Sequence, residues 1–177
     1  MVNSSGPEKH RLLQSETKWR PLSQDFLKVN VDEAFSNKGA YIGVIVRNFK
    51  GISLLICVGQ TKASSSMEAE LMAIRHGISL EEIKGWQRVI VEGDCKPIME
   101  ALSEGNSSPD WKLMPVFEEI NSIASKFSCY FSWINRDANY AADSLAKWTA
   151  SSNFVGFPVR SFYIISHFGI LYYKFIH

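Results

Sequence analysis

Hydrophobic and polar residues alternate in the segment 27–32, where polar side chains separate Leu27, Val29 and Val31. A period of two is typical of a β-strand with one buried face. The pattern therefore predicts a strand that ends at Asp32, with its carboxylate at the rim of a sheet.

Two segments rich in Ile and Val follow this strand, at 41–47 and 52–58. A short stretch of turn-forming residues precedes each of them. Strands joined by such short turns pair in opposite directions, so the first three strands are expected to form an antiparallel meander.

The period changes at Ser65, after which apolar residues recur every three or four positions and predict a helix over 65–85. A helix between the third and fourth strands implies a crossover, which makes the fourth strand parallel to the first. The fold class expected is α/β, a five-stranded mixed sheet flanked by helices. The other predicted elements are strands at 88–91 and 129–135 and helices at 97–102, 112–127 and 139–151.

Length and composition fit one soluble domain. The chain has 177 residues, of which 46% are hydrophobic, and its net charge of +1 gives no basic excess that would indicate nucleic-acid binding. The three cysteines are odd in number and lie in apolar surroundings, which favours reduced thiols.

The N-terminal residues lack the apolar run of a signal peptide, and the C-terminal run is too short and interrupted to span a membrane. We therefore expect an intracellular protein, nuclear or cytoplasmic, that is monomeric and does not bind membranes. The expected organisation is a flexible leader at 1–18, a domain at 19–151 and an apolar tail at 152–177.

Four acidic residues stand out by their positions. Asp32 and Asp94 end strands that the crossover makes parallel neighbours, so both can lie at one sheet edge. Glu70 and Asp143 lie on or beside the apolar stripes of their helices. Taken alone, each is more often an ordinary solvated or salt-bridged residue.

Four carboxylates gathered at one edge repel one another unless cations are present. Oxygen ligands with no His or Cys among them suit Mg²⁺ or Mn²⁺. Two such ions would polarise a water molecule and stabilise the leaving oxygen at a phosphodiester.

Four sequence blocks, each with one of these acids, follow one another along the chain. They are Val29-Asn30-Val31-Asp32, Ala69-Glu70-Leu71-Met72-Ala73, Glu92-Gly93-Asp94 and Arg136-Asp137-Ala138-Asn139-Tyr140-Ala141-Ala142-Asp143-Ser144-Leu145-Ala146. Together the blocks resemble type 1 ribonuclease H, and in detail the plant ribonuclease H-like domains related to non-LTR retrotransposons. The resemblance covers about residues 19–150, and Trp19 and Pro21 are typical openings of the plant group.

The resemblance implies a ribonuclease H-like domain that hydrolyses the RNA strand of an RNA–DNA hybrid, leaving a 5′-phosphate and a 3′-hydroxyl. It implies that Ser66 and Asn139 lie near the substrate backbone and that RNA is distinguished by its 2′-hydroxyl. The catalytic, metal-binding acids implied are Asp32, Glu70, Asp94 and Asp143, with two Mg²⁺ or Mn²⁺ ions.

Two positions depart from the family pattern. Trp133 stands where the family commonly has a His that assists proton transfer or product release, and Glu33 stands where it usually has Gly. The extra charge of Glu33 could weaken phosphate binding or point to solvent. A domesticated module that binds nucleic acid with little or no turnover is therefore the alternative to the nuclease.

The tail leaves a third hypothesis open. Its runs Phe162-Tyr163-Ile164-Ile165 and Ile170-Leu171-Tyr172-Tyr173 have the composition of a strand that binds a partner or aggregates. It could dock on the domain as an added strand, serve as an interaction element, or be non-native sequence at the end of a gene fragment.

Overall fold

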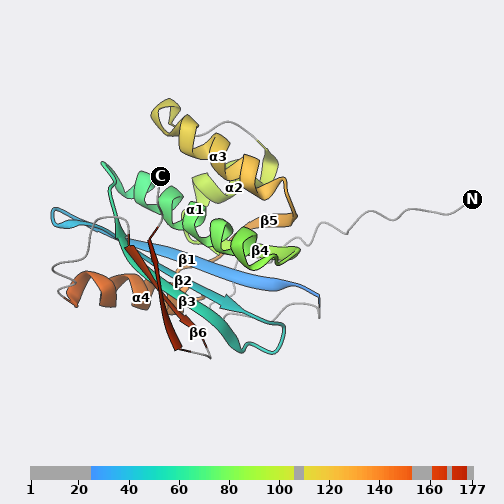
Figure 1. The fold of residues 1–177 in the computed structure, drawn as a ribbon. Helices are drawn as coiled ribbons and strands as arrows, with labels where there is room; N and C mark the ends of the chain where they lie inside the picture. The colour runs from blue at the N-terminus through green and yellow to red at the C-terminus, as the bar shows by residue number, and fades with distance from the viewer. Residues whose placement is uncertain (1–24, 106–109, 153–160, 167–168, 175–177) are drawn as a thin grey trace, which may run out of the picture.

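A computed structural model describes residues 25–105, 110–152, 161–166 and 169–174. One sheet runs through the molecule in the order β5-β4-β1-β2-β3-β6-β7 (Figure 1). The strands are β1 (Leu27–Ser36), β2 (Gly39–Arg47), β3 (Ser53–Thr61), β4 (Arg88–Gly93), β5 (Ser128–Trp133), β6 (Ser161–Ser166) and β7 (Gly169–Lys174).

Helices cover both faces of this sheet (Figure 1). Helix α1 packs on β1 and β2, and α3 packs on α1. Helix α4 lies against β1 and β2 from the other face, while α2 packs on β5. The helical segments are α1 (Ser66–Lys84), α2 (Lys96–Glu104), the 3-10 turn η1 (Trp111–Leu113), α3 (Met114–Ala124) and α4 (Tyr140–Ser151).

The predicted topology is confirmed. Strands β1, β2 and β3 pair antiparallel, and the crossover through α1 makes β4 parallel to β1. The sheet continues beyond the five predicted strands, because β6 pairs antiparallel with β3 and β7 pairs with β6. Residues 161–166 and 169–174 of the tail thus extend the sheet by two strands. The leader at 1–18 lies outside the described residues.

Asp32 does not end its strand, contrary to the sequence prediction. Strand β1 continues to Ser36, and Asp32 pairs with Gly43 of β2. The parallel pairing of β1 with β4 ends at Asn30 and Glu92. Asp32 therefore lies just beyond the last β1–β4 pair, where its side chain can meet residues that follow β4.

Helix α4 approaches the sheet closely at Gly43. A Cβ atom added there would lie 2.5 Å from the Ala142 carbonyl oxygen and 2.7 Å from the Ala146 amide nitrogen. Both alanines are fully buried, as the sequence predicted. Small side chains on both sides thus let α4 bring Asp143 toward the sheet beside Asp32.

The apolar core lies mainly between the sheet and the α1 layer. Val29 and Val31 of β1 touch this helix at Gly77, where an added Cβ would lie 3.0 Å from a Val31 methyl carbon. The core side chains include Val29, Val31, Ile42, Val44, Leu71, Ile74, Ile78, Val89, Val91, Phe117 and Ile120.

Among the described residues, no helix is long and apolar enough to cross a membrane.

Gly43→Ala should lower the free energy of unfolding by about 1–3 kcal/mol, because the new methyl group meets backbone atoms of α4 that cannot move alone. Gly77→Ala is the matched control. Its methyl group meets only side chains, and Ala favours a helix over Gly by about 1 kcal/mol, so the loss should be smaller or absent. Urea unfolding measures both, and equal losses would contradict the close approach of α4.

Candidate metal centre

Three carboxyl groups meet at the end of β4. One carboxylate oxygen from each of Asp32, Glu70 and Asp94 lies within 4.8 Å of the other two. They come from β1, α1 and the residue after β4, so the chain crossover brings them together. Asp32 and Glu70 are 3% and 2% exposed, which places most of this charge inside the protein.

The backbone around Asp94 is shaped to accept Glu70. A Cβ atom at Gly93 would lie 2.7 Å from Glu70 Oε1, so a larger residue there would displace that carboxyl group. On the other side, the Trp133 indole N–H donates a hydrogen bond to the Asp94 carbonyl oxygen at 3.0 Å. Trp133 thus holds the backbone of an acidic residue of the centre.

The carboxyl oxygens of the centre are not all satisfied. Within the described part of the chain, Asp32 Oδ2 and Glu70 Oε1 are buried without a hydrogen-bond partner. Burial, and next the charge of Asp94, raises the pKa of Asp32 to about 7. Burial and the charge of Asp32 raise the pKa of Glu70 well above its usual value. Negative charge is therefore concentrated at this site.

Asp143, the fourth predicted acid, has different partners. Its Oδ1 accepts from Arg136 Nη2 at 2.8 Å and its Oδ2 from Lys147 Nζ at 2.6 Å. Burial acts to raise the pKa of Asp143, but these two hydrogen bonds outweigh it and hold the pKa below its usual value. The structure therefore brings Asp143 near the centre through Arg136, which also lies 3.9 Å from Asp94 Oδ2.

Glu33 and Ser66 contact each other at the rim of the centre. The exposed Ser66 hydroxyl donates a hydrogen bond to Glu33 Oε1, while Glu33 Oε2 is buried without a partner among the described residues. Burial raises the pKa of Glu33, and the charge of Asp94 adds to the rise. Glu33 therefore points toward the acids and does not simply face solvent.

Asn139 is completely buried, and its amide donates to the Val31 carbonyl oxygen at 2.8 Å. Asn30 Nδ2 lies 3.4 Å from Asn139 Oδ1 and 2.8 Å from Glu92 Oε2, and Glu92 also pairs with Lys28 at 2.8 Å. This network ties the start of α4 to β1 and β4. In this structure Asn139 positions the acids from within the protein.

Sequence reasoning missed Arg136, Lys147 and the buried Lys28–Glu92 pair. The pairing of Lys147 with Asp143 could have been predicted, since a Lys four residues after an Asp on a helix lies next to that Asp. The pairing of Arg136 could not, because its position depends on how the loop before α4 folds over the sheet.

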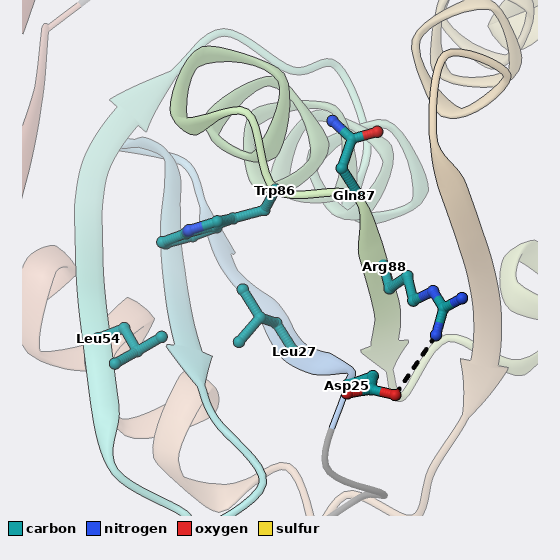
Figure 2. A pocket seen from close by; sticks show the side chains of 6 residues that line it. All are labelled: Asp25, Leu27, Leu54, Trp86, Gln87 and Arg88. Atoms are coloured by element: carbon teal, nitrogen blue, oxygen red, sulfur yellow. Dashed lines mark ion pairs between the residues drawn. The ribbon is translucent and has the colours of Figure 1, made fainter.

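An apolar pocket of about 310 Å³ lies at the opposite end of β1 and β4. Figure 2 shows Trp86 and Leu27 facing into it, with an ion pair of 3.5 Å between Arg88 and Asp25 at one side. It contains none of the clustered acids and is separate from the centre. Its lining residues are Asp25, Leu27, Leu54, Trp86, Gln87 and Arg88.

The donor set of the centre fits a hard divalent cation. All three ligand groups are carboxylates, and two of them carry buried oxygens without partners among the described residues. Mg²⁺ and Mn²⁺ prefer such oxygen ligands, and either would lower the repulsion that raises the pKa of Asp32.

Comparison with solved structures finds the same fold in ribonucleases H of low sequence identity. RNase H1 from the archaeon Halobacterium salinarum has 16% identity, with 72% of this chain and 98% of that chain covered and a TM-score of 0.66. The N-terminal RNase H domain of a Mycobacterium tuberculosis protein has 19% identity, with coverages of 72% and 94% and a TM-score of 0.66.

A third similar structure is LC11-RNase H1, isolated from compost, in complex with an RNA/DNA hybrid. It has 20% identity, with coverages of 67% and 92% and a TM-score of 0.61. At these identities the likeness shows the fold alone. A search of curated protein sequences finds no match.

A family model described as reverse transcriptase-like matches residues 30–149. The matched residues include the three clustered acids, Asp143 and Arg136. The match spans more than half of the chain and shows that the chain belongs to the reverse transcriptase-like family, with the fold seen in ribonucleases H.

Proposed function

We propose that this protein is a metal-dependent endoribonuclease that hydrolyses the RNA strand of RNA–DNA hybrids. The observation that carries the proposal is the cluster of Asp32, Glu70 and Asp94, in which Asp32 and Glu70 are buried and each has a carboxyl oxygen without a partner among the described residues. Burying like charges side by side is costly, and either protonation or a bound cation relieves that cost.

Asp32, Glu70 and Asp94 would hold Mg²⁺ or Mn²⁺, with Asp143 as a further acid beside them. A bound divalent cation supplies Lewis-acid polarisation of a phosphodiester and lowers the pKa of a neighbouring water molecule. The protein supplies fixed negative charge in a largely dry site, where Gly93 and Trp133 hold the acids in place. We include two ions in the proposal, following the family resemblance.

The similar structure of LC11-RNase H1 holds an RNA/DNA hybrid, and this supports the choice of substrate. Ser66 lies exposed at the first turn of α1, where its hydroxyl can reach a substrate backbone. In this structure the Ser66 hydroxyl donates its hydrogen bond to Glu33 Oε1, so it is not available to a phosphate oxygen. Hybrid binding therefore requires Ser66 or Glu33 to rearrange.

A labelled RNA–DNA hybrid should be cut in its RNA strand with Mg²⁺ or Mn²⁺ and left intact in EDTA. Asp32→Asn and Asp94→Asn should each lower the rate by about 100-fold or more, since each removes a charge worth several kcal/mol in the transition state. Asp25→Asn, the same change at an exposed residue away from the cluster, should leave the rate unchanged. Metal-independent cutting would contradict the proposal.

The stability of the metal-free protein should fall as pH rises from about 4 to about 7. The folded-state pKa of Asp32 is raised from 3.8 to about 7, so the fold favours the protonated carboxyl group and loses that stability as the proton leaves. Each unit of pKa difference corresponds to about 1.4 kcal/mol.

Asp32→Asn removes this titration and should unfold at a higher temperature than the wild type at pH 8 in EDTA. Adding Mn²⁺ should stabilise the wild type at that pH and reduce the difference in unfolding temperature between the wild type and Asp32→Asn. Thermal unfolding at several pH values checks both expectations. A wild type that is at least as stable as Asp32→Asn at pH 8 in EDTA would count against a repulsive cluster.

A second candidate is a module that binds nucleic acid without cutting it. Trp133 favours this candidate, because its indole is fixed to the Asp94 carbonyl oxygen and offers no group that exchanges protons near neutral pH. If it is correct, the folded wild type binds both Mn²⁺ and hybrid but does not cut.

Trp133→His should then produce metal-dependent cutting whose rate follows the titration of an imidazole, since a positioned acid or base contributes about 10²–10⁴-fold. Trp133→Phe is the control, because it removes the indole N–H without adding a titratable group. If the wild type cuts the hybrid and Trp133→His cuts it no faster, the second candidate is excluded.

A further inference from the structure

The guanidinium group of Arg136 lies between two of the acids. Its Nη2 is 2.8 Å from Asp143 Oδ1, and its Nε is 3.9 Å from Asp94 Oδ2. The contact joins Asp94, directly after β4, to Asp143 on α4. One positive charge therefore links the acidic cluster to the fourth acid.

The partners of the four acids divide them into two groups. The unpartnered oxygens belong to Asp32 and Glu70, whereas both oxygens of Asp143 accept from cations. Among the described residues, the group that could hold an ion with oxygens within 4.8 Å comprises Asp32, Glu70 and Asp94, without Asp143. The structure thus leaves Asp32 and Glu70 without a cationic partner among the described residues, places Arg136 3.9 Å from Asp94 and pairs Asp143 with two cations.

The directions of the pKa shifts divide the four acids in the same way. Burial raises the pKa values of Asp32, Glu70 and Asp94, and in Asp94 the charge of Arg136 opposes the rise. The hydrogen bonds from Lys147 and Arg136 instead hold the pKa of Asp143 below its usual value. Positive charge from the protein thus already reaches the Asp143 side of the centre.

We propose that Arg136 occupies the place of a second divalent cation between Asp94 and Asp143, so that the protein binds one divalent ion tightly, at Asp32, Glu70 and Asp94. The proposal rests on the metal centre of the proposed function and revises its number of ions. A second ion can bind Asp143 only after displacing the guanidinium group. Arg136 is a positioning residue here, because it acts through Asp94 and Asp143.

A purely structural ion pair is the simpler alternative. The Arg136 side chain is 64% exposed, and exposed pairs contribute little to stability. A structural pair would change the unfolding temperature when removed, but it would not change how many ions the protein binds. The number of bound ions is therefore the decisive measurement.

The test is calorimetric titration with Mn²⁺, which needs neither substrate nor turnover. The wild type should bind one ion, and Arg136→Met should bind two, because the variant keeps an unbranched side chain but removes the guanidinium group and so frees Asp94 and one oxygen of Asp143. Arg136→Lys, which keeps the charge, should bind one. Arg88→Met is the matched control at an exposed ion pair away from the centre and should also bind one.

Two further variants assign the second ion. Lys147→Met frees the other oxygen of Asp143 but leaves Arg136 in place, so it should still bind one ion. Adding Asp143→Asn to Arg136→Met should return the number from two to one. Circular dichroism at the titration temperature shows that each variant is folded.

The outcomes separate this inference from the proposed function. Two ions in the wild type, or one ion in folded Arg136→Met, would overturn the role of Arg136 and leave the nuclease proposal standing. A wild type that binds no Mn²⁺ would refute the metal centre itself and both proposals with it.

Discussion

The repulsion among three carboxyl groups, two of them buried, is the constraint that the site is built to withstand. Asp32, Glu70 and Asp94 approach within 4.8 Å of one another although water cannot screen them well. A fold accepts this only when its other contacts are strong enough to hold the groups in place. The metal-free protein stores in this cluster part of the free energy that a cation would release on binding.

The scaffold holds the acids by close packing and by buried hydrogen bonds. Gly43 and Gly93 leave room where α4 and Glu70 approach the backbone. The network that joins Asn139, Asn30, Glu92 and Lys28 fixes the start of α4 relative to β1 and β4. The network is almost fully removed from solvent, so breaking one member leaves a buried polar group unsatisfied. The positions of the acids therefore depend on residues that never meet a substrate.

Much of the fold could be predicted because hydrophobic periodicity and crossover handedness are local or nearly local signals. Glu70 could be singled out for the same reason, since a charge beside an apolar stripe conflicts with its own pattern. The length of β1 could not be predicted, because Asp32 stays in the strand through pairing with distant Gly43. The pairing of Arg136 with Asp94 was likewise hidden, as it joins parts of the chain that only the tertiary fold brings together.

The hairpin of β6 and β7 changes what the sheet presents at its border. Without it, β3 would expose a row of unpaired amide and carbonyl groups, which can recruit strands from other molecules. Because β6 pairs with β3 from Leu55 to Gly59, that row is satisfied within the chain (Figure 1). The open border moves outward to β7, on the side of the sheet away from β4. Association through β7 would begin on the side of the sheet away from the acids, whereas the other edge strand, β5, lies beside β4 and the metal centre.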